Sequence, residues 1–394
     1  METGIKIRNI TITNIENVLQ NSSDVLNTIG LQEGVLGISL FNYYLFLHAE
    51  KNKYLENVSF YLEHSFNLLT TGENIQRFNI FDLVEMGKYL CFLNREGIID
   101  NENVAIYIKE LQQPIKNLLL RRIEERDLDS VGGVIAIGHY FLEASKLLNY
   151  QSEVENIVKV IDELSVVKED VIYWQFTFRN KEKPTLEPGF FHGISGVLFF
   201  LALVFEKGIL KRVCEKLIHG GIRFLEKNRN SSGINWFPFD LNSKEELSYQ
   251  SLVYGDLGIG YAIYRIGAIL NSKQYTEMGI SILENAAKFR DENNIFVKDA
   301  ELIYGSSGLF GLFDSLAQET KNRMFEKASA YWLEKTLSHG KNDTPWAGFE
   351  TYMNGFDEDI QLSFSHGICG IGIALMTHEM KLDHRKYLSF FNYK

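Results

Sequence analysis

Residues 189–205 read GFFHGISGVLFFLALVF, a short glycine-rich motif that runs directly into an apolar stretch. The apolar stretch, Val197–Phe205, is too short to cross a bilayer, which needs about 20 residues. A helix that is apolar on every side is typical of a protein interior. The sequence therefore predicts a buried helix that begins at Gly193 and Gly196.

The pattern Gly-x-x-Gly followed by an apolar stretch recurs along the chain, which indicates an internal repeat. Clear copies begin at Gly34, Gly193, Gly255, Gly305 and Gly367. Weaker copies lie at Val84–Gly87, which lacks the first glycine, and at Gly132 and Gly133. The last four clear copies are spaced 50 or 62 residues apart, which leaves room for two helices in each repeat.

The segments between the motifs have apolar residues at three- and four-residue spacing, as in 209–227 and 274–290, which is typical of amphipathic helices. Each repeat is thus expected to pair a buried helix with a covering helix. The predicted fold class is all-α: an α/α toroid, a double-ring barrel of about seven helical hairpins. We expect one domain over residues 1–394, with residues 1–20, rich in Ile and Thr, as an extended N-terminal arm or strand.

In such a toroid the glycine motifs are expected to gather at one end of the barrel. The first turn of a helix has unpaired backbone N–H groups and the positive end of the helix dipole. Side chains beside the motifs are therefore expected to face a shared central cleft, although they are far apart in sequence.

Composition excludes some classes of partner. Forty basic residues against 51 acidic ones give a net charge of -11, which disfavours nucleic acid. The three cysteines, Cys91, Cys214 and Cys369, form no CxxC pair and suit a reducing compartment. The N-terminus has no apolar signal segment. We expect a cytoplasmic protein without stable membrane insertion.

The segment Gly189-Phe190-Phe191-His192-Gly193-Ile194-Ser195-Gly196 resembles the G-x-x-H-G-x-x-G signature of lanthionine synthetase C-like (LanC-like) cyclases. Through the repeats, the resemblance covers nearly the whole chain. It implies an α/α barrel that adds peptide cysteine thiols to dehydroalanine or dehydrobutyrine, with zinc held by two Cys and one His. It also implies a precursor peptide as partner, together with a dehydratase or other modification enzymes.

The zinc ligands implied by this resemblance are absent from the matching positions. The family's Trp-Cys-Tyr-Gly is here Leu-Val-Tyr-Gly, which puts Val253 in place of a cysteine. The family's Cys-His-Gly is here Ile-Tyr-Gly, so Ile303 and Tyr304 replace the other two ligands. The family arginine falls on Tyr249. We therefore predict no metal and no cofactor.

Three candidate catalytic residues follow from the resemblance. His192 matches the active-site histidine, Tyr254 matches a tyrosine beside the zinc, and Asp127 is the first match for an aspartate of the third repeat. The irregular glycines there leave Asp129 as the alternative. A histidine paired with a carboxylate could take the thiol proton, and a tyrosine hydroxyl could stabilise or protonate the enolate.

The last repeat carries a second His-Gly, with His366 three residues before Cys369. On one helical face they resemble half a metal site, but Cys is more often a small buried residue. Two functions remain open. The first is a zinc-independent thioether cyclase; the alternative is an inactive scaffold that binds a precursor peptide or partner enzymes. An unrelated glycosidase would need paired carboxylates across the cleft, and the motifs supply no convincing pair.

Overall fold

The clear glycine motifs and the copy at Gly132 and Gly133 open helices, as the sequence predicts, whereas the weak copy at Val84–Gly87 lies inside α4 (Asp82–Arg95). Gly34, Gly133, Gly193, Gly255, Gly305 and Gly367 are the N-cap residues of α2 (Val35–Ala49), α6 (Val134–Ala144), α8 (Ile194–Glu206), α10 (Asp256–Ile269), α12 (Ser306–Thr320) and α15 (Ile368–Glu379). Most residues of these helices are buried on every side, including Ile194–Ala202 of α8. They are the core helices of the repeats.

Gly255 shows why a glycine is required at such a position. Its φ is +89°, a backbone angle that residues with a Cβ rarely adopt, and an added Cβ would lie 2.2 Å from the carbonyl oxygen of Tyr249. A larger residue would therefore displace the chain that leads into α10.

The computed structural model describes residues 2–21, 28–71, 79–177, 183–230, 234–242, 249–290, 296–341, 343–352 and 357–394. Its other elements are α1 (Glu2–Asn21), α3 (Lys53–Thr71), α4 (Asp82–Arg95), α5 (Asn101–Glu124), α7 (Gln151–Glu163), β1 (Val166–Lys168), β2 (Val171–Tyr173), α9 (Lys211–Lys227), α11 (Lys273–Lys288), α13 (Arg323–His339), α14 (Glu358–Leu362), α16 (Arg385–Leu388) and a 3-10 turn at Ser389–Phe391. None of the described helices is both long and apolar enough to cross a membrane.

The chain forms two compact units, one of Met1–Tyr89 with Glu292–Lys394 and one of Leu90–Asp291. The first unit joins the two ends of the chain, because α1 and α2 both pack against α15. The expectation of a single domain over residues 1–394 stays a prediction.

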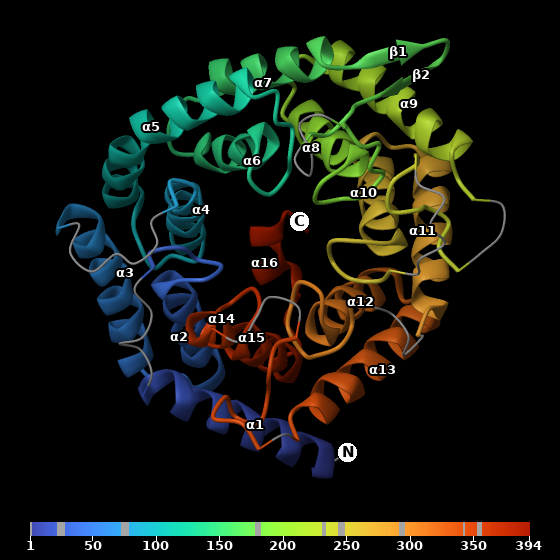
Figure 1. The fold of residues 1–394 in the computed structure, drawn as a ribbon. Helices are drawn as coiled ribbons and strands as arrows, with labels where there is room; N and C mark the ends of the chain where they lie inside the picture. Colours follow the sequence, from blue (N-terminus) through green and yellow to red (C-terminus); the bar gives the residue numbers. More distant parts are fainter. Residues whose placement is uncertain are drawn as a thin grey trace. The chain divides into compact units, whose positions relative to one another are not determined.

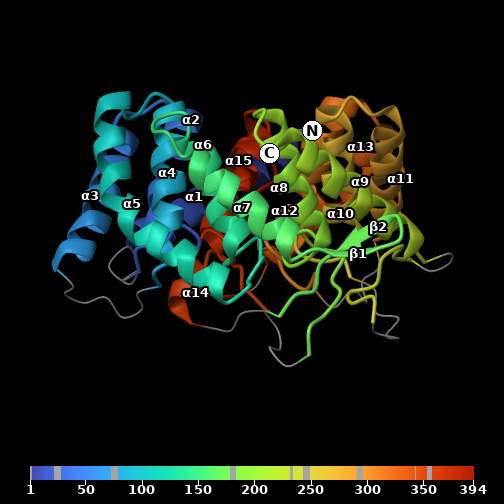
Figure 2. The same cartoon turned by 90° about the horizontal axis from the view of Figure 1, so that it is seen from above.

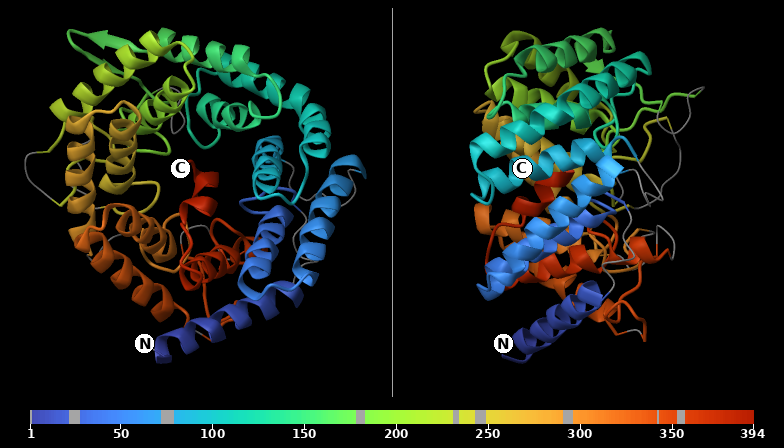
Figure 3. Two further views of the ribbon diagram at one scale, coloured as in Figure 1. Left: turned by 180° about the vertical axis from the view of Figure 1, so that it is seen from behind. Right: turned by 90° about the vertical axis from the view of Figure 1, so that its left-hand side faces the viewer.

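Each core helix packs against a covering helix. In the second unit α9 runs along α8 and α11 runs along α10 (Figure 1). In the first unit α3 covers α2, and α13 covers α12, as the view from behind also shows (Figure 3). In α9, Cys214, Leu217, Ile218, Ile222 and Leu225 are buried, a three- and four-residue spacing that gives the helix one apolar face.

Two features differ from the sequence expectation or go beyond it. The extended arm or strand expected at residues 1–20 is wrong, because α1 is helical. Ile12, Ile15 and Leu19 lie one turn apart and are buried, so tertiary packing outweighs the strand preference of Ile and Thr. In addition, β1 and β2 form a short antiparallel hairpin that contacts α9 (Figure 2).

Glu85 is a half-buried residue of α4 in the first unit, and its carboxyl group is turned toward the chain. It accepts hydrogen bonds from the backbone N–H groups of Leu31, at 2.7 Å, and Gln32, at 2.9 Å. It thereby joins α4 to the connection that leads into α2. Burial raises the pKa of Glu85 to about 8, and the nearby charge of Asp82 adds to the rise.

We predict that Glu85→Gln makes the protein less sensitive to alkaline pH. The pKa of Glu85 is higher in the folded protein than in the unfolded chain. Its contribution to the free energy of unfolding is therefore complete below about pH 4.5 and is lost as the pH rises through about 8. A glutamine keeps an accepting oxygen but cannot ionise. Urea unfolding at pH 6 and pH 9 should therefore show a smaller loss of stability in the variant. An equal loss in both proteins would contradict the assignment.

Candidate functional site

His192 immediately precedes the N-cap of α8 and is paired with a carboxylate of the preceding repeat. Its Nδ1 lies 2.5 Å from Oδ2 of Asp129, and the two side chains are 14% and 8% exposed. A carboxylate on Nδ1 fixes the orientation of the ring and favours the tautomer whose basic lone pair is on Nε2. The pair has the arrangement of an acid–base group.

Backbone groups hold the Asp129 carboxylate in place. Its Oδ1 accepts hydrogen bonds from the N–H groups of Val131, at 2.7 Å, and Gly132, at 2.8 Å, while Oδ2 faces the imidazole. The N–H of Ser130 donates to the carbonyl oxygen of Phe191, at 3.0 Å. The connections before α6 and α8 are thus joined next to the pair.

Asp127 occupies a different place from Asp129. Its Oδ1 accepts the backbone N–H of Asp129 at 3.0 Å, and its Oδ2 lies 3.9 Å from Nη1 of Arg122. Burial raises the pKa of Asp127. An aspartate that bonds the N–H two residues ahead forms an Asx turn, which points the carboxylate back at its own chain. Of the two candidates that the sequence leaves open, Asp129 faces His192 and Asp127 does not.

Tyr254 lies next to His192, as the sequence analysis expects. The ring centroids are 6.1 Å apart. Phe239 and Tyr249 flank Tyr254 with centroids at 4.8 Å and 6.2 Å. Tyr249, at the position where the resemblance places an arginine, is a buried ring that packs against Tyr254 in place of a charge, while the half-buried rings of Phe239 and Tyr254 form an aromatic surface.

Asp256, the first residue of α10, holds part of this aromatic surface in position. It is buried, and it accepts hydrogen bonds from the N–H groups of Trp236, at 2.8 Å, and Phe237, at 3.1 Å. Burial raises its pKa to about 6. The sequence analysis missed this contact, which anchors the connection that carries Phe239.

A second imidazole–carboxylate pair lies in the other unit. Glu301, before α12, bonds Nδ1 of His366, which precedes the N-cap of α15. The other carboxylate oxygen of Glu301 accepts the N–H of Tyr304 at 2.9 Å. The Oδ1 of Asp299 accepts the N–H of Glu301 at 3.0 Å, as the Oδ1 of Asp127 does for Asp129.

The two pairs follow one sequence rule. A carboxylate four residues before a motif glycine contacts the histidine that precedes the next clear motif glycine: Asp129 with His192, and Glu301 with His366. The sequence analysis missed Asp299 and Glu301. Their signal is the shared spacing Asp-x-acid-x-x-x-Gly at residues 127–133 and 299–305.

The surroundings of His366 are strongly acidic. Burial opposes the protonated imidazole, but Glu301, Glu33 and Asp299 outweigh it, so the pKa of His366 is raised. Burial and the charge of Glu301 raise the pKa of Asp299 to about 7. The ring of Tyr304 stacks on His366, with centroids 6.0 Å apart.

Cys369 does not act with His366. Its Sγ donates a hydrogen bond to the carbonyl oxygen of Gly37 at 3.1 Å, and burial raises its pKa well above the ordinary value of a thiol. His366 instead contacts Glu301. The two side chains therefore have different partners, and the thiol is held in its neutral form.

The residues at the positions that the resemblance assigns to zinc do not fit the metal. Val253 and Ile303 are 3% and 4% exposed, and their aliphatic side chains have no lone pair to donate. Tyr304 offers only a phenol, in contact with His366. Zinc chemistry therefore cannot be built from these three residues.

Comparisons with known proteins identify the family and the fold. The family model described as "Lanthionine synthetase C-like protein" matches residues 26–294 and 285–392. The structure named nisin cyclase is similar with a TM-score of 0.75 at 17% identity, over 96% of this chain and 97% of that one. The predicted all-α, α/α-toroid fold class is thereby confirmed.

A weaker likeness is to the cellobiose 2-epimerase of Bacillus thermoamylovorans B4167, with a TM-score of 0.42 at 11% identity over 87% of each chain. That score is too low to inform fold or activity. No curated protein is significantly similar in sequence.

We predict that Asp129→Ala destabilises the second unit by about 1–3 kcal/mol, because it leaves the N–H groups of Val131 and Gly132 without their acceptor. Asp129→Asn keeps an accepting oxygen and should cost less. Denaturant unfolding of both variants measures the difference. Equal stability of Asp129→Ala and the unchanged protein would contradict this role for the carboxylate.

Proposed function

Because the chain belongs to the lanthionine synthetase C-like family, we propose that it is a zinc-independent cyclase that forms thioether rings in a dehydrated precursor peptide. The observation that carries the proposal is the Asp129–His192 pair beside Tyr254. We further propose that the protein works in the cytoplasm, where a dehydratase supplies its substrate.

The proposed reaction needs one base and one acid. Nε2 of His192 takes the proton from the cysteine S–H, and the sulfur forms a bond to Cβ of the dehydroamino acid as the Cα=Cβ π bond breaks. The electrons move onto the carbonyl as an enolate, which the Tyr254 hydroxyl stabilises or protonates at Cα. The His192 imidazolium then gives its proton to the Tyr254 phenolate or to Cα, so one proton leaves sulfur, one reaches carbon, both side chains return to their starting states, and no oxidant or reductant is consumed.

The contacts around His192 suit this role. The Asp129 carboxylate stabilises the imidazolium that forms when the thiol proton is taken, as in other imidazole–carboxylate pairs. The half-buried rings of Phe239 and Tyr254, packed against the buried ring of Tyr249, offer an apolar surface for a dehydrated peptide segment. We propose the His366–Glu301 pair as a second acid–base group, since here too a carboxylate contacts Nδ1 of the imidazole.

The alternative is a catalytically inactive scaffold that binds a precursor peptide or partner modification enzymes. The observation that favours it is the aliphatic character of Val253 and Ile303, which removes metal activation of a thiol. The scaffold would keep the aromatic surface beside Tyr254 but would not depend on the base at His192. The two functions therefore differ in their response to substitution of His192.

We predict that the protein accelerates ring formation in a dehydrated, Cys-containing peptide, and that His192→Ala reduces the enzymatic rate by about 10²- to 10⁴-fold. Thiol alkylation followed by mass spectrometry counts the remaining free thiol against time. A reaction without protein corrects for spontaneous addition, and His64→Ala on α3 is the matched histidine control, expected to leave the rate unchanged.

Asp129→Asn should slow the reaction with unchanged peptide affinity, and His366→Ala tests the second pair in the same assay. If the peptide keeps the same amount of free thiol with the unchanged protein and with His192→Ala, the proposed cyclase activity is contradicted. Absence of product, together with calorimetric peptide binding that His192→Ala does not alter, would establish the scaffold instead.

A further inference from the structure

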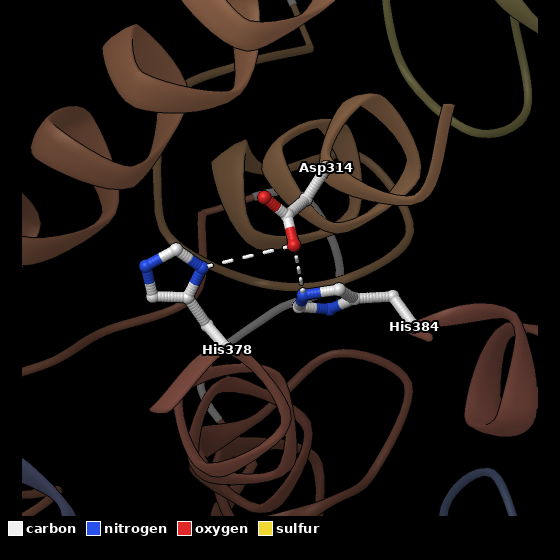
Figure 4. Close-up of side chains that lie close together, drawn as sticks. All are labelled: Asp314, His378 and His384. Carbon is white, nitrogen blue, oxygen red and sulfur yellow. Dashed lines mark ion pairs between the residues drawn. The ribbon is translucent and has the colours of Figure 1, made fainter. Parts of the chain in front are cut away.

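A cluster of two histidines and one aspartate lies in the first unit, away from the glycine motifs. Asp314 is in the middle of α12, His378 is in the last turn of α15, and His384 directly precedes α16. Figure 4 shows both imidazole rings turned toward one oxygen of Asp314. Oδ2 of Asp314 lies 3.3 Å from Nε2 of His384 and 3.8 Å from Nδ1 of His378.

The spacing of these atoms is close to that of a metal site. All three potential ligand atoms lie within 4.8 Å of one another. With metal–ligand bonds of about 2.0–2.2 Å, the ligand atoms of a tetrahedral zinc site are roughly 3.3–3.6 Å apart. The His384–Asp314 distance already has this value, and His378, at a helix end, needs only a small shift.

Two buried ring nitrogens in the cluster make no regular hydrogen bond: Nε2 of His384 and Nδ1 of His378. The His384 side chain is fully buried, and its other nitrogen, Nδ1, is 2.8 Å from the Tyr387 hydroxyl. Buried polar atoms without a hydrogen bond are rare and usually have a reason. A cation between these nitrogens and the Asp314 carboxylate would satisfy both.

The charges around the cluster also suit a cation, because the Asp314 carboxylate faces both rings. The carbonyl end of α15, close to His378, carries the negative end of the helix dipole.

Neighbouring residues hold the three side chains in this arrangement. Oδ2 of Asp314 accepts a hydrogen bond from the side-chain amide of Gln318 at 2.8 Å. The backbone N–H of His384 donates to Oγ of Ser315 at 3.0 Å. At Gly311 a Cβ would lie 2.5 Å from the Tyr387 hydroxyl and 2.9 Å from Nδ1 of His384. The glycine therefore lets α12 approach the ring, and the Tyr387 contact orients it, as outer contacts do for metal ligands.

We propose that Asp314, His378 and His384 bind a divalent transition-metal ion, zinc by ligand type, with water completing the site. The Asp314 and His378 side chains are 18% and 27% exposed, which gives solvent access. Bound there, the ion joins α12, α15 and the C-terminal segment. Asp314 is nine residues after Gly305, about 13 Å along the helix, so the ion has a structural role rather than one at the glycine motif.

The test uses the full-length protein after treatment with a chelator. Zinc chloride is titrated by calorimetry, and thermal unfolding is followed with and without the metal. We expect about one equivalent to bind and the midpoint of unfolding to rise by at least about 2 °C at saturation. His378→Ala, at a partly exposed helix end, should weaken zinc binding at least tenfold, and Asp314→Asn should do the same.

His64→Ala is the matched control and should bind zinc as the unchanged protein does. The proposal is overturned if zinc leaves the unfolding midpoint unchanged, or if His378→Ala and Asp314→Asn bind it as tightly as the control. Cobalt(II) gives an independent readout, because a tetrahedral site produces visible absorption that His378→Ala should abolish. None of these measurements depends on cyclase activity, so the proposed metal site can fail while the proposed function stands.

Discussion

One contact organises the candidate site in each unit. A carboxylate of one repeat binds the imidazole that precedes the next clear motif glycine. Asp129 and Glu301 accept backbone N–H groups of their own turns and use the other oxygen to bind His192 and His366. Each contact joins the start of one core helix to the start of another. The same bond thus stabilises the repeat and prepares the imidazole as a base.

The apolar residues at the family's metal positions are the reason why the proposed reaction depends on these pairs. Val253 and Ile303 are buried and have no donor atom, so in the proposed reaction a side chain takes the thiol proton. General base catalysis contributes about 10²- to 10⁴-fold, and dehydroalanine is reactive enough for that to matter. The packing of Tyr249 against Tyr254 puts an aromatic contact at the position where the resemblance implies an arginine.

Much of the fold could be predicted because glycine motifs and helical periodicity are local signals. The helix starts at Gly193, Gly255 and Gly305 follow from spacing alone. The N-terminal segment could not be predicted in this way, since its Ile and Thr residues favour strands, and only packing against α15 makes it helical.

The candidate site was predictable in part. His192 and Tyr254 precede clear motif glycines, and the structure brings them together. Choosing Asp129 over Asp127 required the hydrogen bonds of an Asx turn, which a sequence does not reveal. The cluster of Asp314, His378 and His384 comes from three separate elements, so its only sequence signal is the residue types themselves.

The most direct test of the central claim is the tautomer of His192, measured by ¹⁵N NMR of the imidazole nitrogens, with His192→Gln identifying the signals. We expect a proton on Nδ1, held by Asp129, and the basic lone pair on Nε2. Asp129→Asn should disturb this preference. A neutral ring protonated on Nε2, with signals that Asp129→Asn leaves unchanged, would show that Asp129 does not prepare His192 as a base.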